Sequence, residues 1–244
     1  IIAFLANQVI ITYLCKRNQT KSTMDSLKDI ITSFKVNSED ERKLLNSNEA
    51  PNVFYKVAEC MLAGHFLVTD GHKDVLVRPT VLEFYYHEEK NGGIKDPIVY
   101  HKTPKSAKTQ KPLIPTGFLH NHVSGIDLAF EHENDGFVRA SVLIREFRVE
   151  LPFSEPSDDV ERDMIGSMKA FSITPGVDDD HSTRLYAALF SSFSVFGDGF
   201  NVKWKDGDSP AVVEFVSPRK NVYQDNVKAK RIPCSSKWQA RIKA

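Results

Sequence analysis

The segment 81–86, which reads V-L-E-F-Y-Y, constrains the fold of this chain more than any other. Its β-branched and aromatic residues suit a pleated, half-buried surface, so we expect a strand there, preceded by the apolar run 75–77. One carboxylate, Glu83, interrupts the segment. Burying a carboxylate as a charge is costly, so such a group is exposed, paired or functional. A solvent-facing or salt-bridged Glu83 is the ordinary interpretation, and a functional Glu83 is the alternative.

The bulk composition is that of an ordinary globular protein. The chain has 244 residues, enough for a substantial core, and its 32 Lys and Arg balance its 32 Asp and Glu. This balance argues against a uniformly basic nucleic-acid coat protein. The cysteines, Cys15, Cys60 and Cys234, form neither a metal-ligand spacing nor a disulfide framework. We therefore expect a protein of the cytoplasm.

The first 50 residues carry helical signals. The apolar run 1–14 is shorter than the roughly 20 residues that cross a bilayer and has no basic leader, so a docked helix is favoured over a membrane anchor. Helices are expected within 20–45, with a second start capped at Ser38. A polar, turn-rich stretch at 46–51 forms the boundary. We expect an N-terminal helical extension, residues 1–50, followed by one domain, residues 51–244.

The second part of the chain mixes helical and strand periodicity. A helix is expected over 53–62 with Gly64 at its end, and a hairpin over 118–131 that turns at Ser124-Gly125. The remaining expected elements are a strand at 66–68, turns at 70–73 and 134–136, a strand at 140–149, helices at 155–171 and 183–193, and a strand at 212–216. This order predicts an α+β fold: a single mixed domain with a curved, mainly antiparallel sheet flanked by helices.

Two segments are basic. The loop 102–111 is rich in lysine and has no acidic residue, which suits a phosphate backbone, although a solvated loop is the more common explanation. The region from Arg219 onward is also basic, with only Asp225 against it. This asymmetry points to a polyanion as partner.

Two histidines of the expected hairpin suggest a metal hypothesis. Alternate residues of a strand share a face, so His120 and His122 could bind a metal ion together with Asp127 from across the turn. Histidines that contact phosphate, or that pack against each other, are the ordinary interpretation.

The order of several motifs is informative as a set. They are L-A-G-H-F-L-V at 62–68, E-F-Y at 83–85, Asp96 with His101, Thr103-Pro104, Ser124-Gly125, V-L-I-R at 142–145 and T-R-L-Y-A-A-L at 183–189. This order resembles that of the alkyladenine (methylpurine, 3-methyladenine) DNA glycosylase family. The resemblance covers residue 51 to the C-terminus and rests on shared order and similar gaps.

The resemblance implies a DNA glycosylase that hydrolyses the N-glycosidic bond of a flipped, alkylated purine nucleotide in base excision repair. Glu83 would activate the attacking water, Arg145 would orient that water, and Tyr85 and His101 would stack on the extruded base. Such a protein would be a monomer without cofactor or metal, and DNA would contact the loop 102–111 and the basic C-terminal region. The other residues expected to contact the substrate are His120, His122, Val123, Ser124, Asp127 and Glu131.

The sequence departs from the family pattern at the hairpin and beyond it. Ser124 stands where the family has a wedging Tyr, which leaves Val123 as a smaller apolar wedge. Glu131 stands at the family's pocket Asn and would bring a second carboxylate near Glu83. Two alternatives therefore stay open. One is a non-catalytic module that binds a nucleic acid or nucleotide on the same fold, and the other is a metal-dependent hydrolase using His120, His122 and Asp127.

Overall fold

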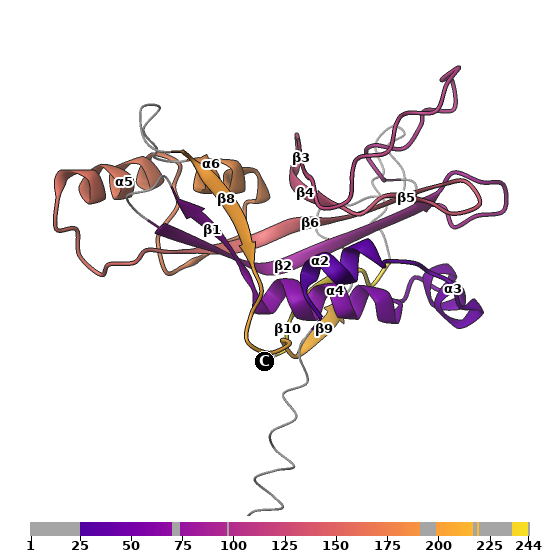
Figure 1. Ribbon diagram of the computed structural model, residues 1–244, viewed down its shortest axis with the longest axis horizontal. Coiled ribbons are helices and arrows are strands. Elements are labelled where there is room, and N and C mark those ends of the chain that lie inside the picture. Colours follow the sequence, from indigo (N-terminus) through magenta and orange to yellow (C-terminus); the bar gives the residue numbers. More distant parts are fainter. Residues whose placement is uncertain are drawn as a thin grey trace, which may run out of the picture.

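The computed structural model describes residues 25–69, 74–96, 98–190, 199–216, 219 and 236–243. It shows a curved antiparallel sheet flanked by helices (Figure 1), so the predicted α+β class is confirmed. The expected apolar run 1–14 and turn 70–73 lie outside the described residues, as do four of the eight basic residues of the C-terminal region. Among the described residues, no helix has both the length and the apolar character needed to cross a membrane.

Ten strands within the described residues form one sheet in which every pair is antiparallel. They are β1 (His65–Thr69), β2 (Asp74–Glu88), β3 (Leu119–His122), β4 (Gly125–Ala129), β5 (His132–Glu133), β6 (Phe137–Glu150), β7 (Asp178–Asp179), β8 (Asn201–Lys205), β9 (Val213–Val216) and β10 (Gln239–Ile242). The main order is β3-β4-β6-β2-β1-β8, and β10 pairs with both β2 and β9. The short strands β8 and β10 were not expected from the sequence.

The helices flank this sheet in two groups (Figure 1). They are α2 (Leu27–Thr32), α3 (Glu39–Asn46), α4 (Asn52–Ala63), α5 (Asp159–Ala170), the 3-10 turn η1 (Ser182–Arg184) and α6 (Leu185–Phe190). Side chains of Ser26 and Ser38 cap α2 and α3 by accepting hydrogen bonds from backbone N–H groups. The apolar side chains of α2 and α3 join the same core as α4. The N-terminal helices thus pack directly against the main body of the protein.

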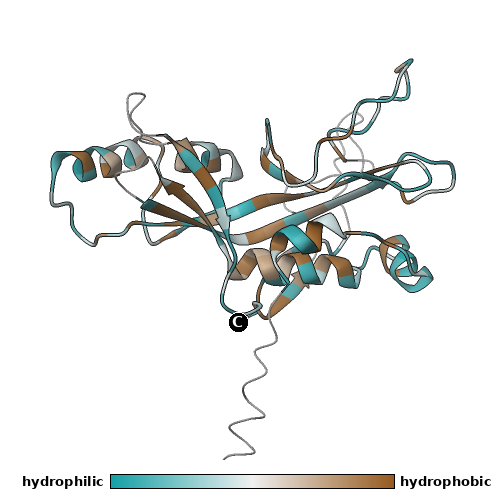
Figure 2. Cartoon of the chain, in the orientation of Figure 1, coloured by the Kyte–Doolittle hydropathy of each residue, from teal (hydrophilic) through white to brown (hydrophobic). Residues whose placement is uncertain are grey.

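The core lies between α4 and one face of the long strands β2 and β6. Phe54, Val57 and Met61 of α4 have no exposed surface, since their spacing aligns them on one side of the helix. The Phe54 ring stacks on the Phe84 ring of β2 at a centroid distance of 4.6 Å. Figure 2 shows hydrophobic residues concentrated along the central strands and the hydrophilic ones on outer helices and loops.

A β-bulge divides β2 into two halves. The register of β2 on β6 shifts at Thr80, between Pro79 and Val81. Pro79 has no N–H to donate to a ladder, and the extra residue bends the strand. On its other edge β2 pairs with β1 before the bulge and with β10 after it. The half of β2 after the bulge carries Glu83 and Tyr85.

Gly64 follows α4 as predicted, but for a different physical reason. A glycine after a helix commonly adopts a left-handed conformation, whereas Gly64 has a φ of −94°. A Cβ atom at this position would lie 2.3 Å from the Trp204 ring and 2.6 Å from the carbonyl oxygen of Lys205. Close approach of β8 therefore explains the glycine.

Candidate functional site

The pleat of the sheet brings the predicted polar residues to the face opposite the α4 core. Phe84 and Val142 point to the core, so their neighbours Glu83 and Tyr85 on β2 point away from it. Glu83 pairs with Leu143 of β6, which in turn pairs with Asp127 of β4. One cross-strand row therefore runs from Glu83 to Asp127.

Glu83 is buried, with 1% of its surface exposed. The Tyr85 hydroxyl donates a 3.1 Å hydrogen bond to its Oε2 atom, and Nε of Arg145 lies 3.6 Å from its Oε1 atom. Burial, and after it the charge of Glu83, raises the pKa of the Tyr85 phenol well above its ordinary value. Tyr85 therefore stays protonated and able to donate.

A second chain of contacts anchors Arg145. Its Nη1 atom donates a 3.0 Å hydrogen bond to the hydroxyl of Ser182, which donates a 2.6 Å hydrogen bond to the carbonyl oxygen of Ser124. Gly125 makes this approach possible, because its φ is +135° and a Cβ atom there would lie 3.0 Å from Ser182. The predicted Ser124-Gly125 turn thus positions Arg145 through η1, a role that the sequence did not reveal.

His101 lies among buried polar groups on the same face. Its Nδ1 atom contacts Oε1 of Glu131, and its Nε2 atom lies 3.4 Å from the Ser141 hydroxyl and 4.0 Å from Oδ2 of Asp127. Ser141 donates a 3.1 Å hydrogen bond to the same Asp127 oxygen. Since Ser141 pairs with Tyr85 in the sheet, His101 lies over the strands that carry the Glu83 group.

Glu131 is held in a way that the sequence did not suggest. Its Oε2 atom accepts hydrogen bonds of 3.0 Å from Nη1 of Arg139 and 2.7 Å from the backbone N–H of Ile114. Arg139, Ile114 and His101 therefore hold the Glu131 carboxylate, which was expected to approach Glu83. The carboxylate that the register aligns with Glu83 is Asp127.

The hairpin β3–β4 carries the two histidines of the metal hypothesis. His120 pairs with Asp127 across the hairpin, and Nε2 of His122 lies 3.0 Å from Oδ1 of Asp127. Burial, and then the neighbouring His101, lowers the pKa of His120. The ligand atoms of His120, His122 and Asp127 do not all lie within 4.8 Å of one another. In the described part of the chain, only Asp179, Asp180 and His181 bring three possible ligand atoms this close together. Of these residues, Asp180 and His181 are exposed.

Arg219 has a different environment from the one expected of a DNA-binding residue. It is buried, and its Nη1 atom donates hydrogen bonds of 2.9 Å to Asp96 and 3.0 Å to the carbonyl oxygen of Phe84. Its guanidinium carbon lies 5.0 Å from the ring centroids of both Tyr85 and Trp238. The C-terminal basic residues Lys237 and Arg241 form ion pairs with Glu49 and Glu214. Arg219, Lys237 and Arg241 are therefore engaged in internal contacts, and Lys243 is exposed.

The basic loop 102–111 is hydrogen bonded to the protein at both ends and has exposed lysines between them. Thr103 donates from both its N–H and its hydroxyl to Glu89, and Arg139 donates to the carbonyl oxygen of Lys111. Lys105, Lys108 and Lys111 are exposed between these anchors. Figure 1 shows the loop projecting away from the sheet beside β3.

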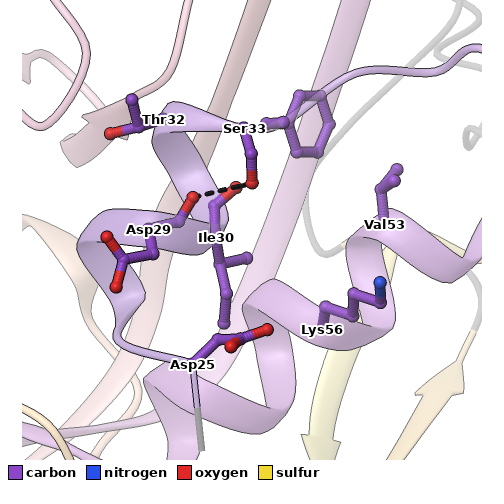
Figure 3. Close-up of a pocket in the computed structure, with 8 residues that line it drawn as sticks. Asp25, Asp29, Ile30, Thr32, Ser33, Val53 and Lys56 are labelled. Atoms are coloured by element: carbon purple, nitrogen blue, oxygen red, sulfur yellow. Dashed lines mark hydrogen bonds between the residues drawn. The ribbon is translucent and has the colours of Figure 1, made fainter.

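A separate pocket of about 500 Å³ lies between α2 and α4 (Figure 3). Its lining includes Asp29 and Ile30 of α2 and Lys56 of α4, and none of the predicted site residues. Since α4 covers the core face of the sheet, this pocket and the Glu83 group belong to opposite faces.

No protein-family model matches the chain, and searches of curated proteins and of solved structures return no match. The functional interpretation therefore depends on the geometry of the described residues and on their chemistry.

Proposed function

We propose that this protein is a DNA glycosylase-like hydrolase that releases a damaged purine base from a flipped nucleotide without a metal ion. The supporting observation is a buried carboxylate, Glu83, with a phenol at one oxygen and a guanidinium beside the other. Tyr85, Arg145 and Glu83 share one face of the sheet, as such chemistry requires. We propose that it acts as a monomer in the cytoplasm.

In the proposed reaction, water attacks the sugar C1′ atom while the bond from C1′ to the base nitrogen breaks. The water proton passes to Glu83, and the electron pair of the broken bond leaves with the base. The sugar becomes positively charged in the transition state, and a carboxylate in a low-dielectric surrounding stabilises such a charge strongly. Arg145, held by Ser182, orients the carboxylate and the water.

The proposed base-binding groups lie beside this centre. His101, Asp127 and Ser141 form a connected polar set on the same face, with donors and acceptors that suit the edge of a base. The exposed lysines of the loop 102–111 supply positive charge for phosphate groups.

The test is release of free base from alkylated and deaminated DNA, duplex and single-stranded, with EDTA present. We expect release by the parent protein and a loss of about 100-fold or more in Glu83→Gln, since the general base is removed. DNA binding and the circular dichroism spectrum should stay unchanged. Glu150→Gln, at a partly exposed carboxylate near the far end of β6, is the matched control. Equal release by Glu83→Gln and the parent would reject the proposal.

Two observations favour the non-catalytic alternative. Arg219 lies against the Tyr85 ring, on which the extruded base would stack, and Glu83 is 1% exposed. A binding module on this fold would retain nucleic acid and release no base from any substrate. The same assay, combined with a binding measurement, separates the two functions.

A further inference from the structure

Four rings lead from the protein surface to the buried polar groups. Tyr100, 57% exposed, stacks on His122 at a centroid distance of 5.1 Å and an angle of 24°. His122 stacks on His120 at 5.8 Å and 26°. His120 meets His101 edge-on at 5.7 Å and 66°. Tyr100 is therefore the exposed end of a ring series that reaches the residues of the proposed site.

The middle of this ring series is fixed in orientation. Nδ1 of His122 accepts a 3.3 Å hydrogen bond from the backbone N–H of Ser124, and its Nε2 atom lies 3.0 Å from Oδ1 of Asp127. Because Nδ1 is hydrogen bonded and Nε2 lies against the Asp127 carboxylate, the imidazole is held in place before any ligand arrives. A rigid ring surface loses little conformational entropy when a flat ligand stacks on it.

The tip of the β3–β4 hairpin is apolar but small. Val123 is 76% exposed and is followed by Ser124 and Gly125. Taking a base out of a duplex costs unstacking energy, and proteins that do so insert a bulky apolar side chain between the base steps. Val123 offers little volume for that purpose. An unpaired strand needs no such insertion.

Positive charge lies next to the ring series in the chain. Lys105, Lys108 and Lys111 are exposed in the loop that starts directly after Tyr100 and His101, and none of the three makes an ion pair with another described residue. Proteins that bind single-stranded nucleic acids without strong sequence preference combine aromatic rings, which stack on the bases, with positively charged side chains that follow the phosphate backbone.

We propose that this site takes its nucleotide from a single-stranded nucleic acid. A base stacks on the exposed ring of Tyr100, which the His122 ring supports from behind, and the phosphates follow the lysine loop. The chemistry at the end of this path rests on the proposed function, whereas the binding step does not depend on it.

The test measures binding by fluorescence anisotropy at one fixed salt concentration. The probe is a labelled DNA strand of about 12 nucleotides, alone or annealed to its complement, a length within the usual site size of single-strand binders. We expect the parent to bind the single strand about tenfold tighter than the duplex. Tyr100→Ala should weaken single-strand binding by about 5- to 100-fold, as stacking contributes to each bound base.

Two variants serve as controls. Tyr100→Phe keeps the ring, and Phe171→Ala removes an exposed ring at the end of α5. Both should stay near the parent value.

Equal or tighter binding of the duplex would overturn this inference, and so would an unchanged affinity in Tyr100→Ala. The two proposals fail separately. A protein that releases no base but shows Tyr100-dependent preference for the single strand retains the inference and loses the proposed reaction. A protein that releases bases through Glu83 and prefers the duplex retains the reaction and loses the inference.

Discussion

Arg139 and Glu131 form an ion pair of 3.0 Å in which neither side chain has any exposed surface. The same guanidinium donates to Glu89 at 2.8 Å and to the carbonyl oxygens of Lys111 and Pro112. One cation thus connects β6, the segment after β4 and the base of the lysine loop. Removing it leaves two buried carboxylates without their principal donor.

We therefore expect Arg139→Met to lower the free energy of unfolding by roughly 3–5 kcal/mol, because breaking one side of a buried pair leaves an uncompensated charge. Urea denaturation measures the loss. Arg162→Met removes an arginine of similar size from an exposed pair with Asp159 on α5 and should change stability by less than about 1 kcal/mol. Equal effects of the two substitutions would contradict the assigned role of Arg139.

The Tyr85 hydroxyl gives a test of the proposed reaction that differs from removing the carboxylate. Tyr85→Phe deletes the 3.1 Å hydrogen bond to Glu83 and keeps the ring. If Glu83 takes the water proton, this change should slow base release by about 10- to 100-fold under single-turnover conditions and leave DNA binding near the parent value. An unchanged rate of base release would exclude the hydroxyl from the reaction and leave Tyr85 with stacking alone.

Glu88 should make the protein sensitive to acid. Burial alone would raise the pKa of Glu88, but hydrogen bonds from Arg42, Tyr86 and the backbone of Ile94 outweigh it and hold the pKa below its ordinary value. The unfolded chain therefore binds the proton first as pH falls. The stabilisation is complete above the unfolded pKa of about 4.3 and is lost as pH falls through the folded value.

Urea denaturation between about pH 7 and pH 3 measures this loss. Glu88→Gln should be less stable than the parent at pH 7, since Arg42 loses its partner, and its stability should change less over the acid range. Glu155→Gln, at an exposed carboxylate, serves as control and should follow the parent curve. Identical acid profiles for the parent and Glu88→Gln would exclude this carboxylate as a source of acid sensitivity.

Two glycines should respond to alanine in opposite directions. Gly125 has a φ of +135°, and a Cβ atom there would lie 3.0 Å from both Leu143 and Ser182. We expect Gly125→Ala to cost roughly 2–4 kcal/mol of stability through strain and overpacking. Gly166 lies inside α5 with nothing within 4 Å of the added atom, so Gly166→Ala should stabilise the protein by roughly 0.5–1 kcal/mol. Thermal unfolding of both variants gives the sign of each change.

The local pattern of the sequence predicted more of the fold than of the site. The β-branched and aromatic residues of 81–86 correctly indicated a strand, and Glu83 and Tyr85 lie on one face of it because side-chain direction in a strand depends only on parity. The Asn134-Asp135-Gly136 turn was likewise readable, since Asp135 and Gly136 both adopt positive φ, as tight hairpin turns require. Strands β8 and β10 escaped prediction although both alternate polar and apolar residues, because each is only four or five residues long.

What only the tertiary structure decided is which polar groups meet. The sequence alone determined the strand, its polar face and the presence of carboxylates, histidines and arginines on the expected hairpins. It did not determine that Arg139 holds Glu131, that Arg219 reaches Asp96 across 123 positions, or that Asp127 shares the row of Glu83. Such contacts depend on strand register, the Thr80 bulge and loop closure, which are set by packing of the whole sheet and not by neighbouring residues.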